Sequence, residues 1–233
     1  MSNPRSHRKS GFSLVESLVV IAIMAILLGI VVNGGGATSG ASKLTSAGYQ
    51  LQTAFNMARE NSIAKHHLTA IAILIDPTMP DVAYRTYTFL ETSNSPADPT
   101  NPWTQADKWE HLPAGVIIDN KNTTLTLGTS SITNTSSFVL NDATSTASPA
   151  MPTLIYNGHS YPPGTGYIAQ ILESSGGLSD SAPSPCILTL TTGFYSSGGS
   201  TPTYTYKGTG TAYANYFCLF FNNETGQIKI LRQ

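Results

Sequence analysis

The sequence predicts an α+β fold in which a long N-terminal α-helix, transmembrane in its first half and amphipathic in its second, packs on a β-rich antiparallel head. Three observations carry this prediction. An apolar run covers residues 12–32, apolar side chains recur at helical spacing between residues 44 and 62, and alternation with a period of two dominates from residue 69 onward. One helix followed by many strands is an α+β plan.

The apolar run is long enough to cross a bilayer. Residues 17–32 contain no charged side chain, and with residues 12–16 the run reaches 21 residues, close to the ~20 that a membrane helix needs. Arg5, Arg8 and Lys9 precede it, without any acid. Because positive charge favours the cytoplasmic side, we expect residues 1–11 to stay in the cytoplasm and the C-terminal bulk to lie outside. Residues 12–33 are therefore predicted to be a single membrane span.

Glu16 is the one acid in this run. A carboxylate in a membrane helix is costly unless it finds a partner, so it is a candidate functional residue. In lipid it would take up a proton or seek a cation. The plainer alternative is a tolerated acid near the end of a helix, at the membrane interface.

Gly11-Phe12-Ser13-Leu14-Val15-Glu16 resembles the processing site of type IV pilins and type II secretion pseudopilins. In that family a membrane aspartyl peptidase cuts after the glycine and methylates the new N-terminus. The resemblance implies that residues 1–11 are a leader, that Gly11 is its last residue and that Phe12 is the methylated N-terminus. It also implies that Glu16 pairs with the terminal amine of a neighbouring subunit and sets the axial register of a filament.

The same resemblance implies where the protein resides and what it meets. The expected partners are the prepilin peptidase, other pilin or pseudopilin subunits and the bacterial inner membrane. The head is expected in the periplasm, on a single-pass anchor that can enter a pilus or a secretion pseudopilus.

A glycine cluster follows the apolar run. Four glycines fall within residues 33–40, and each weakens a helix by about 1 kcal/mol relative to alanine. We therefore expect the helix to fray or unwind there, and residues 34–67 to form a glycine hinge followed by an amphipathic helix. An ordinary flexible linker is the alternative for the cluster. The amphipathic part has one narrow stripe, expected to pack on a face of the sheet: Leu44, Ala47, Leu51, Ala54, Phe55, Ala58 and Ser62.

Residues 68–233 are predicted to form the β-rich head. A turn at residues 222–226 should join the last two strands as a hairpin. Loops rich in proline, glycine and serine are expected at 93–107, 141–152, 174–185 and 196–202. The predicted strands are 69–75, 83–90, 115–119, 124–127, 137–140, 153–156, 167–172, 186–191, 203–207, 213–221 and 227–231.

Three segments carry a narrower resemblance. Residues 51–65, with Ala54, Arg59 and Ala64, resemble the segment after the anchor in the GspH/FimT group of minor pseudopilins. Residues 109–116 resemble a strand opening of that group, and residues 220–230 its closing strands. Long insertions rich in serine and threonine depart from the compact pattern of the group. The chain also resembles pilin-like cassette proteins of the Verrucomicrobia type.

Cys186 and Cys218 lie outside the membrane in this topology. In an oxidising periplasm they could pair, and closing that loop would stabilise the fold by about 3–4 kcal/mol. Cys218 lies in an apolar run, residues 216–221, so a buried thiol is an equally good interpretation. The sequence leaves both open.

The sequence contains none of the common motifs for catalysis or for binding a metal ion or a phosphate group. The sequence has no nucleophile elbow, no cysteine or histidine set at zinc spacing, no calcium loop and no phosphate loop. We therefore expect a non-enzymatic protein without catalytic residues, metal, cofactor or small-molecule substrate. Without Arg5, Arg8 and Lys9 the chain keeps nine basic residues against 13 acidic ones, a net charge of about −4. Nucleic acid is therefore not an expected partner.

Two alternatives belong to other classes of protein. A signal peptide shares the basic start and the apolar core, so the chain could be a secreted β-domain, a lectin or an enzyme, that starts near Thr38 or Ser42. Against this, signal-peptide cores are normally uncharged and this one contains Glu16. The other alternative is a minor pilin that binds DNA, which would need a basic patch. Near the C-terminus only Lys229 and Arg232 supply one.

Overall fold

The computed structural model describes residues 14–76, 78–92, 103–119, 124–127, 130–133, 151–179, 186–196, 202–204 and 216–232; of residues 26–39, 124–127, 130–133 and 202–204 it describes the backbone alone. The chain divides into two compact units, Met1–Gly40 and Ala41–Gln233. The helix α1, Leu14–Lys65, contributes residues to both.

Residues 34–40 are helical within α1, which corrects the expected break at the glycine cluster. Glycine lowers helix stability but keeps its backbone N–H, so the ladder of hydrogen bonds can pass through it, unlike through proline. The boundary between the two units nevertheless falls at the end of this cluster, between Gly40 and Ala41.

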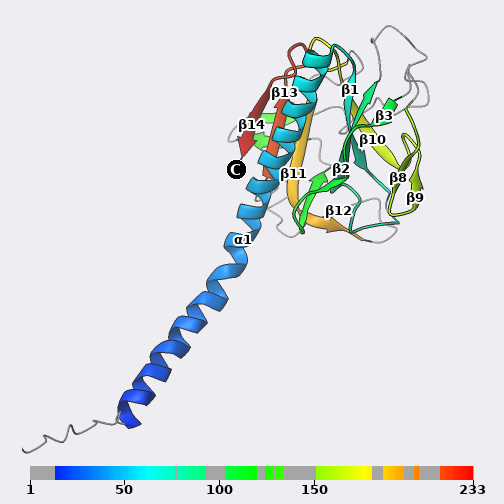
Figure 1. The fold of residues 1–233 in the computed structure, drawn as a ribbon. Helices are drawn as coiled ribbons and strands as arrows, with labels where there is room; N and C mark the ends of the chain where they lie inside the picture. The colour runs from blue at the N-terminus through cyan, green and yellow to red at the C-terminus, as the bar shows by residue number, and fades with distance from the viewer. Residues whose placement is uncertain are drawn as a thin grey trace, which may run out of the picture. The chain divides into compact units, whose positions relative to one another are not determined.

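The amphipathic stripe on α1 is confirmed. All of its members are buried, and none is more than 4% exposed: Leu44, Ala47, Leu51, Ala54, Phe55, Ala58 and Ser62. Two of the aromatic contacts that anchor α1 reach strand β13, Tyr216–Phe221. Tyr49 meets Phe217 edge to face at 5.6 Å between ring centroids, and Phe55 meets Phe221 at 4.7 Å. Figure 1 shows β13 and β11 beside this part of α1.

Two antiparallel sheets build the second unit. The first has the strand order β10-β1-β2-β3, with β4 also paired to β2. Its strands are β1 Thr69–Leu74, β2 Thr86–Thr92, β3 Trp103–Gln105, β4 Glu110–His111 and β10 Tyr167–Leu172. The second has the order β12-β11-β13-β14, with β5 also paired to β11. Its strands are β5 Val116–Asp119, β11 Cys186–Tyr195, β12 Pro202–Tyr204, β13 and β14 Ile228–Arg232.

Two short hairpins complete the described strands. The first pairs β6, Thr124–Leu127, with β7, Ser130–Thr133, and the second pairs β8, Leu154–Tyr156, with β9, His159–Tyr161. All the pairings between these described strands are antiparallel, so the antiparallel α+β class predicted from the sequence is confirmed.

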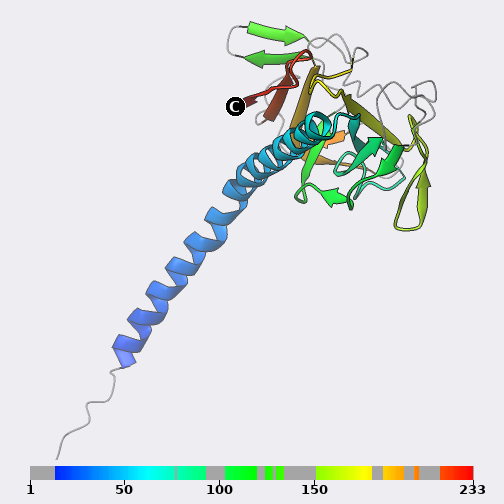
Figure 2. The same ribbon diagram turned by 45° about the horizontal axis from the view of Figure 1, so that its top comes forward.

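The stripe on α1 enters a core shared by both sheets, rather than packing on one sheet as we expected. Side chains from alternate positions of the first sheet, such as Ile71 and Ile73, meet those of the second, such as Leu188 and Leu190. The intervening positions Ala70 and Ala72 face a second core, to which the β8–β9 hairpin contributes. Figures 1 and 2 place this hairpin beyond the first sheet, on the side away from α1. Because β1 is covered on both faces, it is apolar from Ala70 to Leu74.

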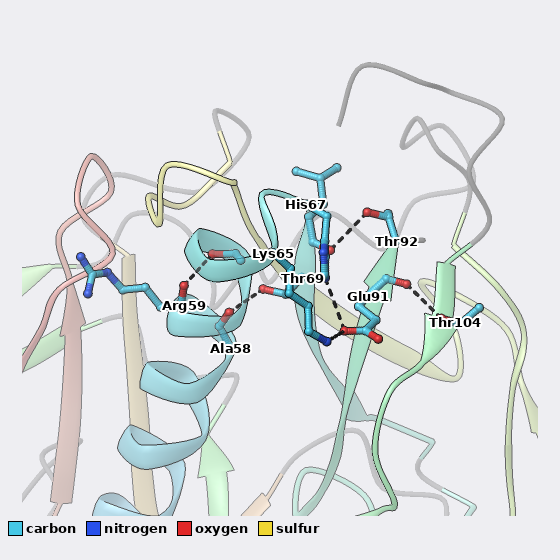
Figure 3. Close-up of polar contacts among 10 residues, drawn as sticks. Ala58, Arg59, Lys65, His67, Thr69, Glu91, Thr92 and Thr104 are labelled. Carbon is cyan, nitrogen blue, oxygen red and sulfur yellow. Dashed lines mark hydrogen bonds and ion pairs between the residues drawn. The ribbon is translucent and has the colours of Figure 1, made fainter. Parts of the chain in front are cut away.

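The C-terminal end of α1 is tied to the first sheet by polar contacts (Figure 3). Lys65 Nζ lies 2.7 Å from Glu91 Oε2 on β2, and His67 Nε2 lies 3.4 Å from the same oxygen. The hydroxyl of Thr69 donates to the carbonyl of Ala58 at 2.8 Å. The hydrogen bond from Lys65 holds the pKa of Glu91 below its usual value. The last turn of α1 is therefore bonded to β2 through Lys65, and the turn at Ala58, about two turns earlier, is bonded to β1, the strand that follows.

The predicted strands differ from the observed ones mainly where strands are short. The strands predicted at 124–127 and 167–172 have the observed bounds of β6 and β10, and β11 runs four residues beyond its predicted end. The strand predicted at 137–140 lies outside the described residues. Four strands of two to four residues, β3, β4, β7 and β9, were not predicted. Strand β3 lies in a stretch predicted to be a loop, because three residues are too few to display a period.

The predicted hairpin turn at residues 222–226 is confirmed. Asn222 Oδ1 accepts hydrogen bonds from the backbone N–H groups of Glu224 and Thr225 at 3.0 and 3.1 Å, and Gly226 has a positive φ of 64°. Arg59 of α1 donates from Nε to the carbonyl of Thr225 at 2.7 Å. The turn is thereby held against the helix.

We predict that Gly226→Ala destabilises the fold by about 3 kcal/mol, because a left-handed alanine is strained and its Cβ would overlap the Gly176 carbonyl oxygen. Gly158→Ala is the matched control: its φ is also positive, at 79°, but its Cβ would have nothing within 4 Å. That control should cost only about 1 kcal/mol. Urea unfolding of the full chain in detergent micelles measures both. Equal losses would show that the Gly176–Gly226 contact is not tight.

Candidate functional site

The first turns of α1 present apolar side chains on every side. All described side chains from residue 14 to residue 25 are exposed. Successive residues of a helix point about 100° apart, so four consecutive ones cover its circumference. The large hydrophobic side chains here are 46–81% exposed: Leu14, Val15, Leu18, Val19, Val20, Ile21, Ile23 and Met24. A helix that is apolar all round is normally buried in a core or in a membrane, so this surface needs a covering from outside its own unit.

Glu16 lies in the first turn of α1 and is exposed. It is the only acid among residues 14–25. The N-terminal end of a helix carries a partial positive charge, which favours a carboxylate there by about 0.3–1 kcal/mol. Gly11 and Phe12, the residues predicted at the cleavage site, lie outside the described residues.

Among the residues that the structure describes, no helix is both long enough and apolar enough to cross a membrane.

Cys186 and Cys218 are not joined by a disulfide, so the pairing that the sequence left open is wrong and the buried-thiol alternative holds. The strand register explains this, because Cys186 lies opposite Phe221 and Cys218 opposite Thr189. The two cysteines are therefore three positions out of register, and side chains at such positions point to opposite faces of the sheet. Cys186 belongs to the core shared with α1, and Cys218 to a small cluster on the other face.

Burial raises the pKa of the Cys218 thiol to about 12, although the nearby Thr189 hydroxyl, 3.5 Å from Sγ, acts against the rise. A thiol with such a pKa is almost entirely protonated at neutral pH. It is therefore a poor nucleophile.

No group of three or more histidine, cysteine or acidic side chains among the described residues is arranged to hold a metal ion. His66 and His67 are adjacent in the sequence, but their side chains lie in different surroundings. His66 is exposed and left-handed at the helix end, with a φ of 53°, whereas His67 is buried beside Glu91.

The sequence did not single out a groove that runs along the exposed side of α1, between the helix and strand β2. Its larger part has a volume of about 410 Å³ and its smaller part about 110 Å³. Both parts share Met57, Phe89 and Asp107, so they adjoin each other, and the two together are called the α1–β2 groove below. The only signal in the sequence is the pair Tyr49 and Met57, large side chains off the buried stripe that are 46% and 49% exposed.

Residues 6–32 match the family described as the prokaryotic N-terminal methylation motif. No curated protein matches the chain. Among solved structures, the minor pseudopilin EpsH of the type 2 secretion system of Vibrio cholerae is 14% identical, with a TM-score of 0.39, over 81% of this chain and 96% of that one. The type IV minor pilin FimU of Pseudomonas aeruginosa is 12% identical, with a TM-score of 0.37, over 82% and 89%. TM-scores below 0.5 at such identities are too low to assign a function.

The match to the methylation motif covers Gly11, Phe12 and Glu16 and the whole apolar run. It confirms the prediction of a prepilin-type N-terminal segment. The chain therefore carries a prokaryotic N-terminal methylation motif at residues 6–32.

We predict that neither native cysteine reacts with a maleimide in the folded protein at pH 8, because both are buried and the pKa of Cys218 is about 12. Counting labelled thiols by mass spectrometry should give none in native buffer and two in urea. Because no disulfide is present, prior reduction should not change the count. Two labels that appear only after reduction would show a disulfide instead.

Proposed function

We propose that this protein is a subunit of a type IV pilus or of a type II secretion pseudopilus, made as a precursor, processed by a prepilin peptidase and assembled through α1. The observation that carries the proposal is the methylation motif at residues 6–32, which leads directly into a helix whose first turns are apolar on every side. Such a helix is suited to residence in lipid before assembly and to helix packing after it.

Processing falls between Gly11 and Phe12 in this proposal. Cleavage removes the leader, residues 1–11, with its three basic residues, and frees an amine at Phe12. Methylation of that amine keeps its positive charge. The new N-terminus then lies four residues before Glu16 in the sequence.

Glu16 sets the register between subunits. In an apolar surrounding its carboxylate is costly alone, and the amine of a neighbouring subunit, at the same depth, can pair with it. A buried polar pair of this kind fixes axial position better than apolar contacts do, because a shifted register leaves both charges unpaired.

The anchor and the head occupy different surroundings. Residues 12–33 span the bacterial inner membrane once, and the β-rich head, residues 68–233, lies in the periplasm together with the amphipathic part of α1, which belongs to residues 34–67. The three basic residues of the leader favour this orientation. The boundary at Gly40 between the two compact units lies within the segment 34–67 and is a place where α1 can bend.

The finer assignment is a GspH/FimT-like minor subunit. It is supported by the segment 51–65, by residues 109–116 and by the closing hairpin. The partners are the prepilin peptidase, the other subunits of the filament and the membrane, and the role is structural rather than enzymatic.

We predict that Gly11→Leu leaves the leader attached. In the family that the motif resembles the peptidase cuts after glycine, so the variant should accumulate in membranes at the mass of the precursor, 11 residues larger than the mature chain. Immunoblotting and intact-mass measurement distinguish the two forms. Recovery of the normal mature mass from this variant would count against the peptidase.

We predict that Glu16→Ala abolishes assembly but leaves the head folded. The expected result is a mature protein retained in the membrane with unchanged protease resistance and at least a tenfold fall in filament-associated subunit. Glu60→Ala, which removes an exposed acid elsewhere on α1, is the control and should assemble normally. If Glu16→Ala filaments are normal in number and length, Glu16 does not set the register.

A further inference from the structure

The α1–β2 groove has a fixed polar wall. The hydroxyl of Tyr87 donates to Glu110 Oε2 at 2.7 Å. Gln50 donates from Nε2 to the Tyr87 oxygen at 3.2 Å and to the His111 carbonyl at 3.1 Å. These contacts hold the Glu110 carboxylate against the groove. Burial and the contact with Glu110 raise the pKa of the Tyr87 phenol, and the hydrogen bond from Gln50 acts against that rise. Glu110 is therefore a positioned anion rather than a loose surface charge.

The charge of the groove is one-sided. The larger part is lined by two carboxylates, Asp107 and Glu110, and by no lysine, arginine or histidine. The smaller part is also lined by Lys65, whose Nζ forms an ion pair with Glu91 Oε2 at 2.7 Å. Lys108 has an exposed side chain next to Asp107 but lines neither part. Met57 and Phe89 add apolar side chains to the lining of both parts.

The groove is elongated and follows the helix. Its α1 residues recur every three or four positions from Ser46 to Lys65, which corresponds to about 28 Å at 1.5 Å per residue. Rows of side chains at this spacing are the ridges against which a second helix packs. Exposed methionine adapts to differing partners, and Met57 lies where the two parts of the groove join.

We propose that the α1–β2 groove binds a helix of a neighbouring subunit that presents a lysine or arginine within an apolar stripe. The aliphatic stem of that side chain lies on Met57 and Phe89, and its charged end reaches Asp107 and Glu110. The proposal rests on the proposed function, because a filament subunit has helical neighbours. It names a surface of the head, separate from Glu16, that selects the neighbour by charge.

The experiment uses the full chain in detergent micelles and two defined probes. One probe is an 18-residue amphipathic peptide of leucine, alanine and lysine with a single cysteine, activated as a mixed disulfide. The other has glutamate in place of each lysine. The chain carries either Thr53→Cys, in the groove, or Asn56→Cys, exposed on α1 outside it. The rate of disulfide formation is normalised to the rate with a small neutral disulfide. The native thiols are buried and should stay silent.

With the lysine peptide, the normalised rate of disulfide formation should be at least tenfold higher at Thr53→Cys than at Asn56→Cys. With the glutamate peptide, the two rates should not differ in this way. Adding Glu110→Lys should remove the preference, whereas Glu60→Lys, an exposed acid outside the groove, should keep it. Equal rates at the two positions, equal preference for both peptides, or equal loss from both charge reversals would each overturn the proposal.

If the mature N-terminus is Phe12 and the preference for the lysine peptide at Thr53→Cys is absent, the groove proposal fails and the proposed function stands. If the preference is present in a chain that is not cut at Gly11, the proposed function fails alone.

Discussion

The buried stripe on α1 is the contact on which the second unit depends. Its side chains fill a core that two separate sheets share, so neither sheet closes its inner face without the helix. Leu51 and Phe55 are almost completely buried, and burying such a side chain contributes about 1.5–3 kcal/mol each. The helix is thus a structural member of the head and not only its tether.

This dependence explains the contacts around the stripe. At the helix end, Lys65 bonds to Glu91 on the first sheet, and nearly two turns earlier Arg59 bonds to the hairpin turn of the second. The close approach of Gly226 to Gly176 allows this turn to lie against α1. Each contact is modest by itself. Together they fix which face of the helix is buried, and so which face, with Tyr49 and Met57, is left as the wall of the groove.

The parts of the fold that the sequence predicted are those with a regular period. The seven positions of the α1 stripe repeat every three or four residues over five turns, and all seven are buried. Strand β10 and the final hairpin likewise have clear boundaries. The hairpin between β8 and β9 was missed although Asn157 and Gly158, both with positive φ, are a strong turn signal. Its strands have only three residues each.

Other features depend on the tertiary structure and leave no pattern in the sequence. Whether Cys186 and Cys218 can pair is decided by a register offset of three between β11 and β13, which no spacing along the chain reveals. Helix propensity gave the wrong prediction at the glycine cluster because glycine disfavours a helix without preventing one. The α1–β2 groove was missed because its acids, at 107 and 110, come from a segment brought to the helix only by folding.

The most direct test of the proposed function is the N-terminal residue and its mass in protein recovered from membranes. The account predicts a chain that begins at N-methylated Phe12, which corresponds to cleavage after Gly11 and one added methyl group. A chain that begins near Thr38 or Ser42 would contradict it, because a signal peptidase would then have removed Glu16 and the apolar helix together.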